Sequence, residues 1–232
     1  MSVMELVSVP FRWGSALRRR RVFHPNGVVA EGVIERLATA GVGLPLPSAT
    51  ILARVSKAAG MPGGLPDAIG LAFRVLSSGD SSAGSDWDVL LASAVPGPIV
   101  RSVGLRPVTS WSGSSMTSLA PLRYRDTNWW LRARITTEID GSGLQLDSIR
   151  SALEQGEIAI DVDQATATSP FQPLARVTLT KPAPGRDVSF DPVLHTAPGV
   201  EMYPRWLANL RAYAYAQSRE GRANDHAPPL RN

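Results

Sequence analysis

The 232-residue sequence contains no cysteine, which excludes disulfides, thiolate catalysis and Cys-ligated zinc or iron–sulfur centres. Charged residues are scarce, at 19%, and histidine occurs only as His24, His195 and His226. No apolar run reaches the roughly 20 residues of a membrane-spanning helix, and no apolar segment with a small-residue cleavage site opens the chain. We therefore expect a cytoplasmic protein without a membrane span.

Glycine and proline are abundant, with 20 and 19 residues, and apolar residues make up 44% of the chain. This composition favours an antiparallel β architecture with many turns over a helical bundle. The length is sufficient for one domain with a sizeable core. We predict a single domain over residues 1–222, followed by a polar, disordered tail over 223–232.

Short apolar stretches between turn-rich segments predict strands at 49–56, 69–76, 86–93, 107–111, 118–123, 129–137, 158–162 and 175–181. In the first stretch, Ile51, Ala53 and Val55 share one face, so Arg54 and Ser56 face the other side. An arginine on a covered strand face needs an anionic partner. The spacing of these strands is typical of a closed or nearly closed antiparallel sheet.

Helices are predicted at 5–22, at 148–155 and at 205–219. Asp147 or Ser148 would cap the second helix at its N-terminus. On the third, Arg211 precedes Tyr215 by about one turn, where a guanidinium favours the phenolate form of a tyrosine. A phenolate oxygen suits ferric iron. Taken alone, the pair is more typical of ordinary helix packing with a solvated charge.

A loop with the sequence Arg21-Val-Phe-His24-Pro-Asn-Gly27 precedes a stretch that contains Ala30 and Gly32. This pattern predicts a loop entering a strand whose glycines allow another group to approach closely. Taken alone, His24 is compatible with a purely structural role.

Basic residues lie at two places that could contact nucleic acid, but simpler interpretations exist. Arg18–Arg21 is typical of a solvated helix end. Trp129-Trp130, beside Arg132 and Arg134, could stack on bases, yet an alternating strand with Leu131, Ala133 and Ile135 inward explains the pattern. Asp161 and Asp163 alternate with apolar residues and predict an exposed strand face. We expect no nucleic-acid partner.

In order along the chain, several of these segments resemble the catalase family. Arg21-Val-Phe-His24-Pro-Asn-Gly27 resembles the distal-histidine motif, and Arg54-Val-Ser56 resembles the block that follows it. The segment from Asp67 to Arg74 and the tripeptide Trp87-Asp88-Val89 are similar to the next two catalase strands.

The C-terminal half continues the resemblance, which spans about residues 18–222. Phe190-Asp191-Pro192, Pro198-Gly199-Val200-Glu201, Arg211-x-x-x-Tyr215 and Arg222 follow catalase order. The chain is much shorter than a classical catalase and is similar to the small catalase-related proteins. The resemblance implies an α+β fold, with an antiparallel catalase-like β-barrel, a C-terminal haem-ligand helix and short flanking helices.

The resemblance also implies a cofactor, haem b, and a role for each matching residue. Tyr215 would ligate the iron, as in catalases, and Arg211 would hold it as phenolate. His24 would be the distal acid–base group, and Ser56 would orient it. Three arginines would pair with the haem propionates: Arg21, Arg54 and Arg222.

Two departures from the catalase pattern change the expected activity. Ala92 stands where catalases carry the distal asparagine, and Ser93 follows it, so the second peroxide donor is missing or replaced by a weaker hydroxyl. Pro25 replaces a small residue after the histidine. We predict peroxidase-type reduction of hydrogen peroxide or organic hydroperoxides by an unknown electron donor, with weak or no catalase turnover.

Three alternatives stay open at this point. The same site could rearrange a fatty-acid hydroperoxide without an external reductant. The barrel could bind haem, or another flat anionic ligand, without turnover, or it could be a haem-free scaffold. The catalase arm and C-terminal helical domain are absent from the sequence, so an arm-exchanged tetramer and bound NADPH are not expected, while a homodimer is open.

Overall fold

The computed structural model describes residues 27–77, 86–95, 105–167, 169–186 and 188–203. The helices predicted at 5–22 and 205–219 and the tail at 223–232 lie outside these ranges. The described elements are β1 Gly27–Arg36, β2 Ala49–Lys57, β3 Ile69–Val75, β4 Trp87–Ala92, β5 Ser115–Thr117, β6 Leu122–Tyr124, β7 Thr127–Ile135, α2 Leu146–Gln155, β8 Ile158–Thr166, β9 Gln172–Pro182 and β10 Glu201–Met202.

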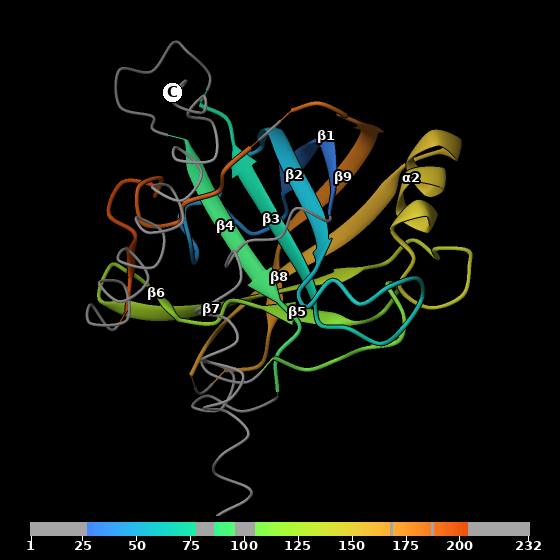
Figure 1. The fold of residues 1–232 in the computed structure, drawn as a ribbon. Helices are drawn as coiled ribbons and strands as arrows, with labels where there is room; N and C mark the ends of the chain where they lie inside the picture. Colours follow the sequence, from blue (N-terminus) through green and yellow to red (C-terminus); the bar gives the residue numbers. More distant parts are fainter. Residues whose placement is uncertain (1–26, 78–85, 96–104, 168, 187, 204–232) are drawn as a thin grey trace, which may run out of the picture.

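Eight of these strands form a closed antiparallel barrel. Their order is β7-β5-β4-β3-β2-β1-β9-β8, and β8 pairs back with β7 to close the ring (Figure 1). Strand β6 pairs with the start of β7, and β10 pairs with β6 at the margin. The predicted antiparallel barrel is thus confirmed.

The barrel interior is a packed hydrophobic core. Side chains alternate along each strand, so Ile51, Ala53 and Val55 of β2 and Leu71 and Phe73 of β3 are buried inside. The inward-facing residues predicted for β7 are confirmed: Leu131, Ala133 and Ile135. A core this dense leaves the outer face of the strands as the place to bind a large ligand.

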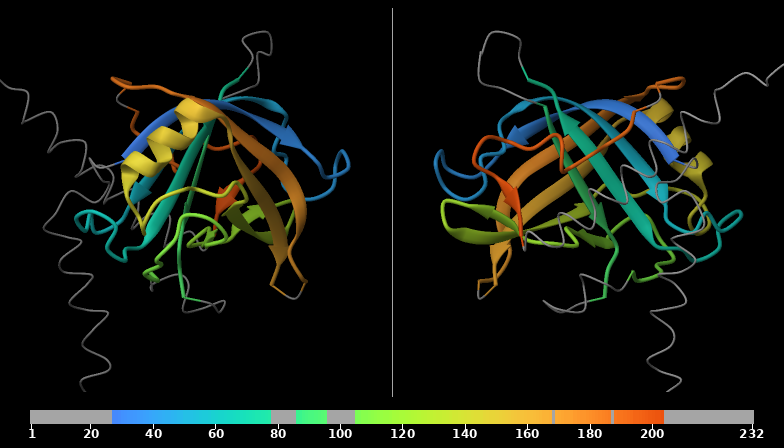
Figure 2. Two further views of the ribbon diagram at one scale, coloured as in Figure 1. Left: turned by 90° about the vertical axis from the view of Figure 1, so that its right-hand side faces the viewer. Right: turned by 60° about the vertical axis from the view of Figure 1, so that its left-hand side comes forward.

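Helix α2 packs against β9 and β1 on the outside of the barrel (Figure 2). Ile149 and Leu153, one turn apart, are its buried residues. The prediction that Asp147 or Ser148 caps this helix is wrong, because Gln145 occupies the N-cap without a side-chain hydrogen bond. Among the described residues, no helix is both long and apolar enough to cross a membrane.

Two predicted strands differ from the structure. Residues 107–111 form only an isolated bridge between Val108 and Asp67. The stretch predicted as one strand at 118–123 lies between β5 and β6 and enters only the latter. Pro121 lacks the N–H that a continuous ladder requires. Ser118 still contacts β7, because its hydroxyl accepts a hydrogen bond from the Leu131 amide at 3.1 Å.

The packing of Gly32 and Asp163 decides two local predictions. Gly32 does allow close approach, because a Cβ there would lie 2.2 Å from the Thr178 carbonyl oxygen. The expectation that Asp163 is exposed is wrong: it is buried, and its carboxylate accepts a 2.6 Å hydrogen bond from Arg132 Nη2. The pairing of β8 with β9 shifts register between Val162 and Asp163, an irregularity that the sequence pattern does not reveal.

Candidate functional site on the outer face of the barrel

Four small residues form a row across the outer face of β1–β4. Gly27 is opposite Ser56, Ser56 is opposite Gly70, and Gly70 is opposite Ala92. Neighbouring strands lie about 4.8 Å apart, so this small-residue row is about 14 Å wide. All four residues are half-buried. The register therefore builds a flat strip without bulky side chains.

Arg54 lies in the next outward-facing row, beside the small-residue row. A Cβ at Gly27 would lie only 2.9 Å from Arg54 Cγ, so glycine at this position makes room for the arginine stem. Arg54 Nη2 donates to the Val188 carbonyl at 2.6 Å, and its guanidinium lies 5.5 Å from the Phe190 ring centroid. The arginine is thus held on the outer face by the segment that begins at Val188.

The structure brings Arg54 and Ser56 together on one face, as the alternation in β2 predicts. Ala92 lies at the other end of the small-residue row. The remaining predicted site residues lie outside the described part of the chain: Arg21, His24, Arg211, Tyr215 and Arg222.

Ser93 lies apart from the small-residue row. It is buried, and its hydroxyl accepts a hydrogen bond from the Ile69 amide at 3.0 Å. The same hydroxyl donates to the Arg106 carbonyl at 2.7 Å. Because a serine has one hydroxyl hydrogen, this contact already uses it. Ser93 therefore fastens the end of β4 to its neighbours, and the site proposed below does not use it.

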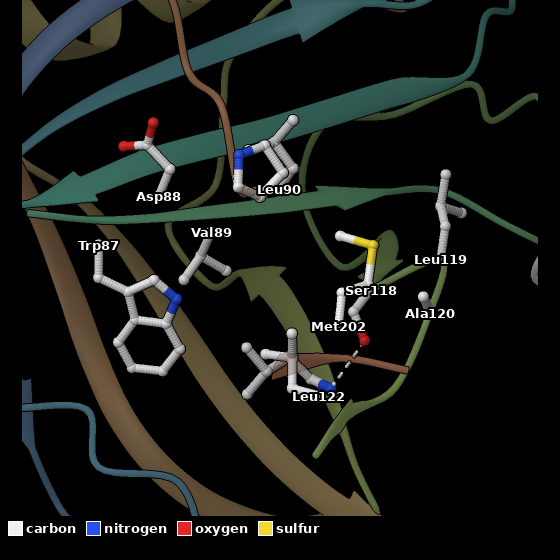
Figure 3. A pocket seen from close by; sticks show the side chains of 11 residues that line it. Trp87, Asp88, Val89, Leu90, Ser118, Leu119, Ala120, Leu122 and Met202 are labelled. Atoms are coloured by element: carbon white, nitrogen blue, oxygen red, sulfur yellow. Dashed lines mark hydrogen bonds between the residues drawn. The ribbon is translucent and has the colours of Figure 1, made fainter. Parts of the chain in front are cut away.

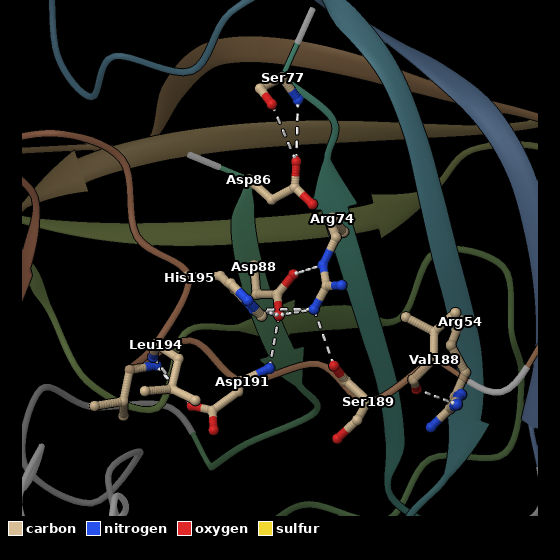
Figure 4. Close-up of polar contacts among 11 residues, drawn as sticks. Arg54, Arg74, Ser77, Asp86, Asp88, Val188, Ser189, Asp191, Leu194 and His195 are labelled. Atoms are coloured by element: carbon tan, nitrogen blue, oxygen red, sulfur yellow. Dashed lines mark hydrogen bonds and ion pairs between the residues drawn. The ribbon is translucent and has the colours of Figure 1, made fainter. Parts of the chain in front are cut away.

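The segment 188–203 crosses the outer face of β3 and β4 (Figure 4). The Ser189 carbonyl accepts a hydrogen bond from Arg74, and the Asp191 amide donates to Asp88 Oδ2 at 2.6 Å. Further on, the Asp88 amide donates to the His195 carbonyl at 3.0 Å. The segment ends beside β6, where the Tyr203 amide donates to the Pro121 carbonyl. It thus joins the Arg54 side of the outer face to the β6 side.

Arg74, Asp88 and His195 form a charged cluster beneath this segment. Arg74 binds both carboxylate oxygens of Asp88, with Nε–Oδ1 at 2.6 Å and Nη2–Oδ2 at 2.7 Å. The Asp88 side chain is fully buried, at 0% exposure, and the Arg74 side chain is 18% exposed. The hydrogen bond to Asp88 raises the pKa of Arg74 above its ordinary value despite the cost of burial.

Sequence reasoning missed this cluster as a unit. The sequence points to Asp88 only as part of the Trp87-Asp88-Val89 tripeptide that resembles catalases. The sequence feature that could have indicated the cluster is Arg74, because a charged residue in an otherwise apolar strand needs a partner if its face is covered. Its partners lie 14 and 121 positions further along the chain, so no local pattern links them.

A small cavity lies between β4, the segment 118–122 and the segment that covers β4 (Figure 3). Its lining includes Trp87, Leu90, Leu122, Pro192 and Met202. Its volume of about 30 Å³ holds one or two water molecules. A flat macrocycle fits neither this cavity nor the packed interior.

No protein-family model matches the chain, and no curated protein matches its sequence. The resemblance to catalases therefore depends on the ordered motifs in the sequence.

Proposed function

We propose that this protein binds haem b on the outer face of β1–β4 and reduces hydrogen peroxide or an organic hydroperoxide with electrons from an external donor. The observation that carries the proposal is the strand register. It sets Arg54 and Ser56 on one outward-facing side of β2, beside a row in which Gly27, Gly70 and Ala92 are all small.

The composition of this face fits a flat, acidic ligand. A Cβ at Gly70 would lie 3.2 Å from Ser56 Oγ, tighter than ordinary contact, so glycine keeps the face level around the serine hydroxyl. Arg54 supplies a positive charge at the margin, which suits a propionate. Larger side chains at these positions would project from the sheet and keep a ring system from lying against it.

The position of His24 in the sequence supports the same site. His24 precedes Gly27 by three residues, and three residues of chain reach at most about 11 Å. Gly27 is directly opposite Ser56 in the β1–β2 pair. The chain is therefore short enough to keep a histidine beside the serine that is proposed to orient it.

The place where the described chain ends supports a contribution of C-terminal residues to the proposed site. Met202 and Leu90 line the same small cavity, so the segment ends near β4. Tyr215 follows Tyr203 by twelve residues, which span about 18 Å in a helix. A helix of that length is long enough to extend over the small-residue row, which is about 14 Å wide.

Each proposed residue has a distinct chemical role. Bound haem would supply the iron at which the peroxide O–O bond is cleaved. The His24 imidazole takes a proton from the near peroxide oxygen and returns it to the leaving oxygen, which departs as water from hydrogen peroxide or as an alcohol from an organic hydroperoxide. Ser56 orients that imidazole. Tyr215, held as phenolate by Arg211, would ligate the iron, and the propionates would pair with Arg21, Arg54 and Arg222.

Ala92 determines which peroxide reaction is favoured. An amide at this end of the row would give peroxide a second hydrogen-bond donor, and alanine cannot donate. Dismutation requires a second peroxide to be positioned for oxidation, whereas peroxidase turnover takes its electrons from another molecule. We therefore assign peroxide reduction by an external donor, with weak or no catalase turnover.

The test is to express the protein with adequate haem and iron, and to record its absorption spectrum and peroxidase activity. Wild type should show a high-spin ferric spectrum with tyrosinate ligation, and Tyr215→Phe should abolish this signature. His24→Ala should keep haem but lose most activity. A wild-type rate no better than that of free haem would overturn the enzymatic proposal.

A second candidate is a haem-binding protein without turnover. Ala92 favours it, because alanine offers no side-chain donor where catalases carry an amide, and Ser93 is already bonded to the backbone. Tight haem binding without peroxide-dependent oxidation of any donor would select this function. Product analysis of a fatty-acid hydroperoxide without a donor would identify a rearrangement reaction instead.

A further inference from the structure

The cluster of Arg74, Asp88 and His195 connects three parts of the chain through one carboxylate (Figure 4). Asp88 Oδ2 accepts from Arg74 Nη2 at 2.7 Å and from the Asp191 amide at 2.6 Å, and it lies 3.0 Å from His195 Nδ1. Strands β3 and β4 and the segment 188–203 therefore meet at a fully buried side chain.

The number of available hydrogens places one on His195 Nδ1. Arg74 Nη2 carries two hydrogens, and its acceptors are Asp88 Oδ2 and the Ser189 carbonyl at 2.9 Å. The 3.0 Å contact between Arg74 Nη2 and His195 Nδ1 is then left without a hydrogen from the arginine. Nδ1 therefore carries a hydrogen and donates it to Asp88.

The cluster is also joined to Arg54 through an aromatic ring. The Phe190 ring centroid lies 5.5 Å from the Arg54 guanidinium carbon and 5.9 Å from that of Arg74. Phe190, itself a residue of the segment, is buried. Phe190 therefore links the cluster to Arg54, the residue that we assign to a propionate.

The cluster lies too far along β4 to contact a ligand over the small-residue row directly. Asp88 precedes Ala92 by four residues on β4, which separates their Cα atoms by about 14 Å. The cluster acts on the site through the segment that it holds. That segment leads, eight residues after His195, to Tyr203, where the described chain ends.

We propose that Arg74, Asp88 and His195 are positioning residues that hold the segment 188–203 against β3 and β4 and so set the point from which the chain continues toward Tyr215. The functional part of this inference rests on the proposed haem site. The active group on the histidine is the Nδ1 hydrogen, which Asp88 accepts.

The experiment compares two substitutions of His195. In His195→Asn, the amide nitrogen occupies nearly the place of Nδ1 and retains a donor to Asp88. In His195→Gln, the amide lies nearer the place of Nε2, and that donor is lost. Because the His195 side chain is 37% exposed, both variants are expected to fold. Asp88→Asn serves as a third variant that removes the carboxylate.

The first measurement is independent of haem. The chain has no cysteine, so Thr50→Cys and Gln217→Cys allow specific spin labelling of the barrel and the C-terminal segment. Wild type and His195→Asn should give one narrow distance distribution, and His195→Gln and Asp88→Asn should give broadened ones. Equally narrow distributions in all variants, or a broad one in wild type, would overturn the inference.

The second measurement is haem affinity of the unlabelled variants by absorbance titration. His195→Gln should raise the haem dissociation constant at least about tenfold, equivalent to about 1.4 kcal/mol, while His195→Asn stays within about twofold of wild type. If His195→Asn behaves like His195→Gln in both measurements, the assignment of the Nδ1 hydrogen is overturned. A third outcome separates the two proposals. If the distance distributions broaden in His195→Gln and Asp88→Asn but wild type binds no haem, the positioning role is supported and the proposed function is contradicted.

Discussion

At the residue scale, the site depends on which side of a strand each side chain occupies. Ala92 belongs to the small-residue row, whereas the next residue, Ser93, is buried and bonded to the backbone. Similarly, Asp88 lies under the covering segment and Val89 lies in the core. Chemical identity alone therefore does not decide whether a residue can act on a ligand.

Introducing an amide at the end of the row should change the reaction. Ala92→Asn should increase the ratio of oxygen release from hydrogen peroxide to peroxidase turnover by about tenfold or more, because it adds a hydrogen-bond donor beside the peroxide. Oxygen-electrode and donor-oxidation assays measure the two rates. Ala159→Asn, a half-buried alanine on β8, is the control, and an equal change in that variant would contradict the prediction.

Removing the arginine of the buried ion pair should destabilise the protein strongly. Arg74→Met leaves the buried Asp88 carboxylate without its main partner, which should cost about 3 kcal/mol of unfolding free energy. Urea unfolding measures this cost. Arg123→Met, which breaks the exposed pair with Asp126, should cost less than about 1 kcal/mol. Similar losses of unfolding free energy in the two variants would contradict the prediction that the buried ion pair matters more than the exposed one.

At the element scale, register decides what the strands place together. The β1–β2–β3–β4 ladder aligns residues separated by up to 65 positions, as in the pairs that connect Gly27 to Ala92. An irregularity in the β1–β9 ladder lies between Glu31 and Gly32. There Gly32 lets the Thr178 carbonyl oxygen come so close that a Cβ at this position would lie only 2.2 Å from it.

Filling that close approach should disturb the β1–β9 pair. Gly32→Ala should lower the unfolding free energy by about 1 to 3 kcal/mol, because its methyl group meets backbone atoms that cannot move independently. Thermal or urea unfolding would measure the loss. Gly156→Ala is the matched control: its backbone is extended at φ 178°, and no atom lies within 4 Å of the new Cβ. It should change stability by less than about 0.5 kcal/mol.

At the scale of the whole molecule, closure of the barrel separates a packed inside from an outer face, which α2 and the segment 188–203 cover in part. The β7–β8 pairing closes the ring, and large side chains such as Phe73 and Leu131 fill its centre. Trp111, another buried residue, donates its indole N–H to the Gln145 carbonyl at 3.1 Å, which ties the core to the start of α2. Stability and ligand binding should therefore depend on opposite faces of the same strands.

Two neighbouring residues of β3 test this separation. Phe73→Leu should lower the unfolding free energy by about 1 to 2 kcal/mol and leave haem affinity unchanged, because it loosens only the core. Ala72→Phe should change stability by less than about 1 kcal/mol and weaken haem binding at least tenfold by placing a ring on the outer face. Urea unfolding and haem titration of both variants provide the measurements. The reverse pattern would place the ligand inside the barrel.

Local sequence patterns determined much of the barrel. Alternation in β2 predicted correctly that Arg54 and Ser56 share a face opposite Ile51 and Val55, because the side-chain period of a strand is two. The low share of charged residues and the abundance of glycine and proline favoured an antiparallel sheet with many turns. Patterns in the sequence also led to His24 and Tyr215, whose places lie outside the described residues.

Tertiary structure decided the remaining features, because they depend on pairings between distant segments. The burial of Asp163 follows from its pairing with Arg132 across two strands, and the cluster of Arg74, Asp88 and His195 follows from the path of the segment 188–203. Local alternation specifies a face but not a register or a covering segment. The small-residue row exists only because four strands meet in register.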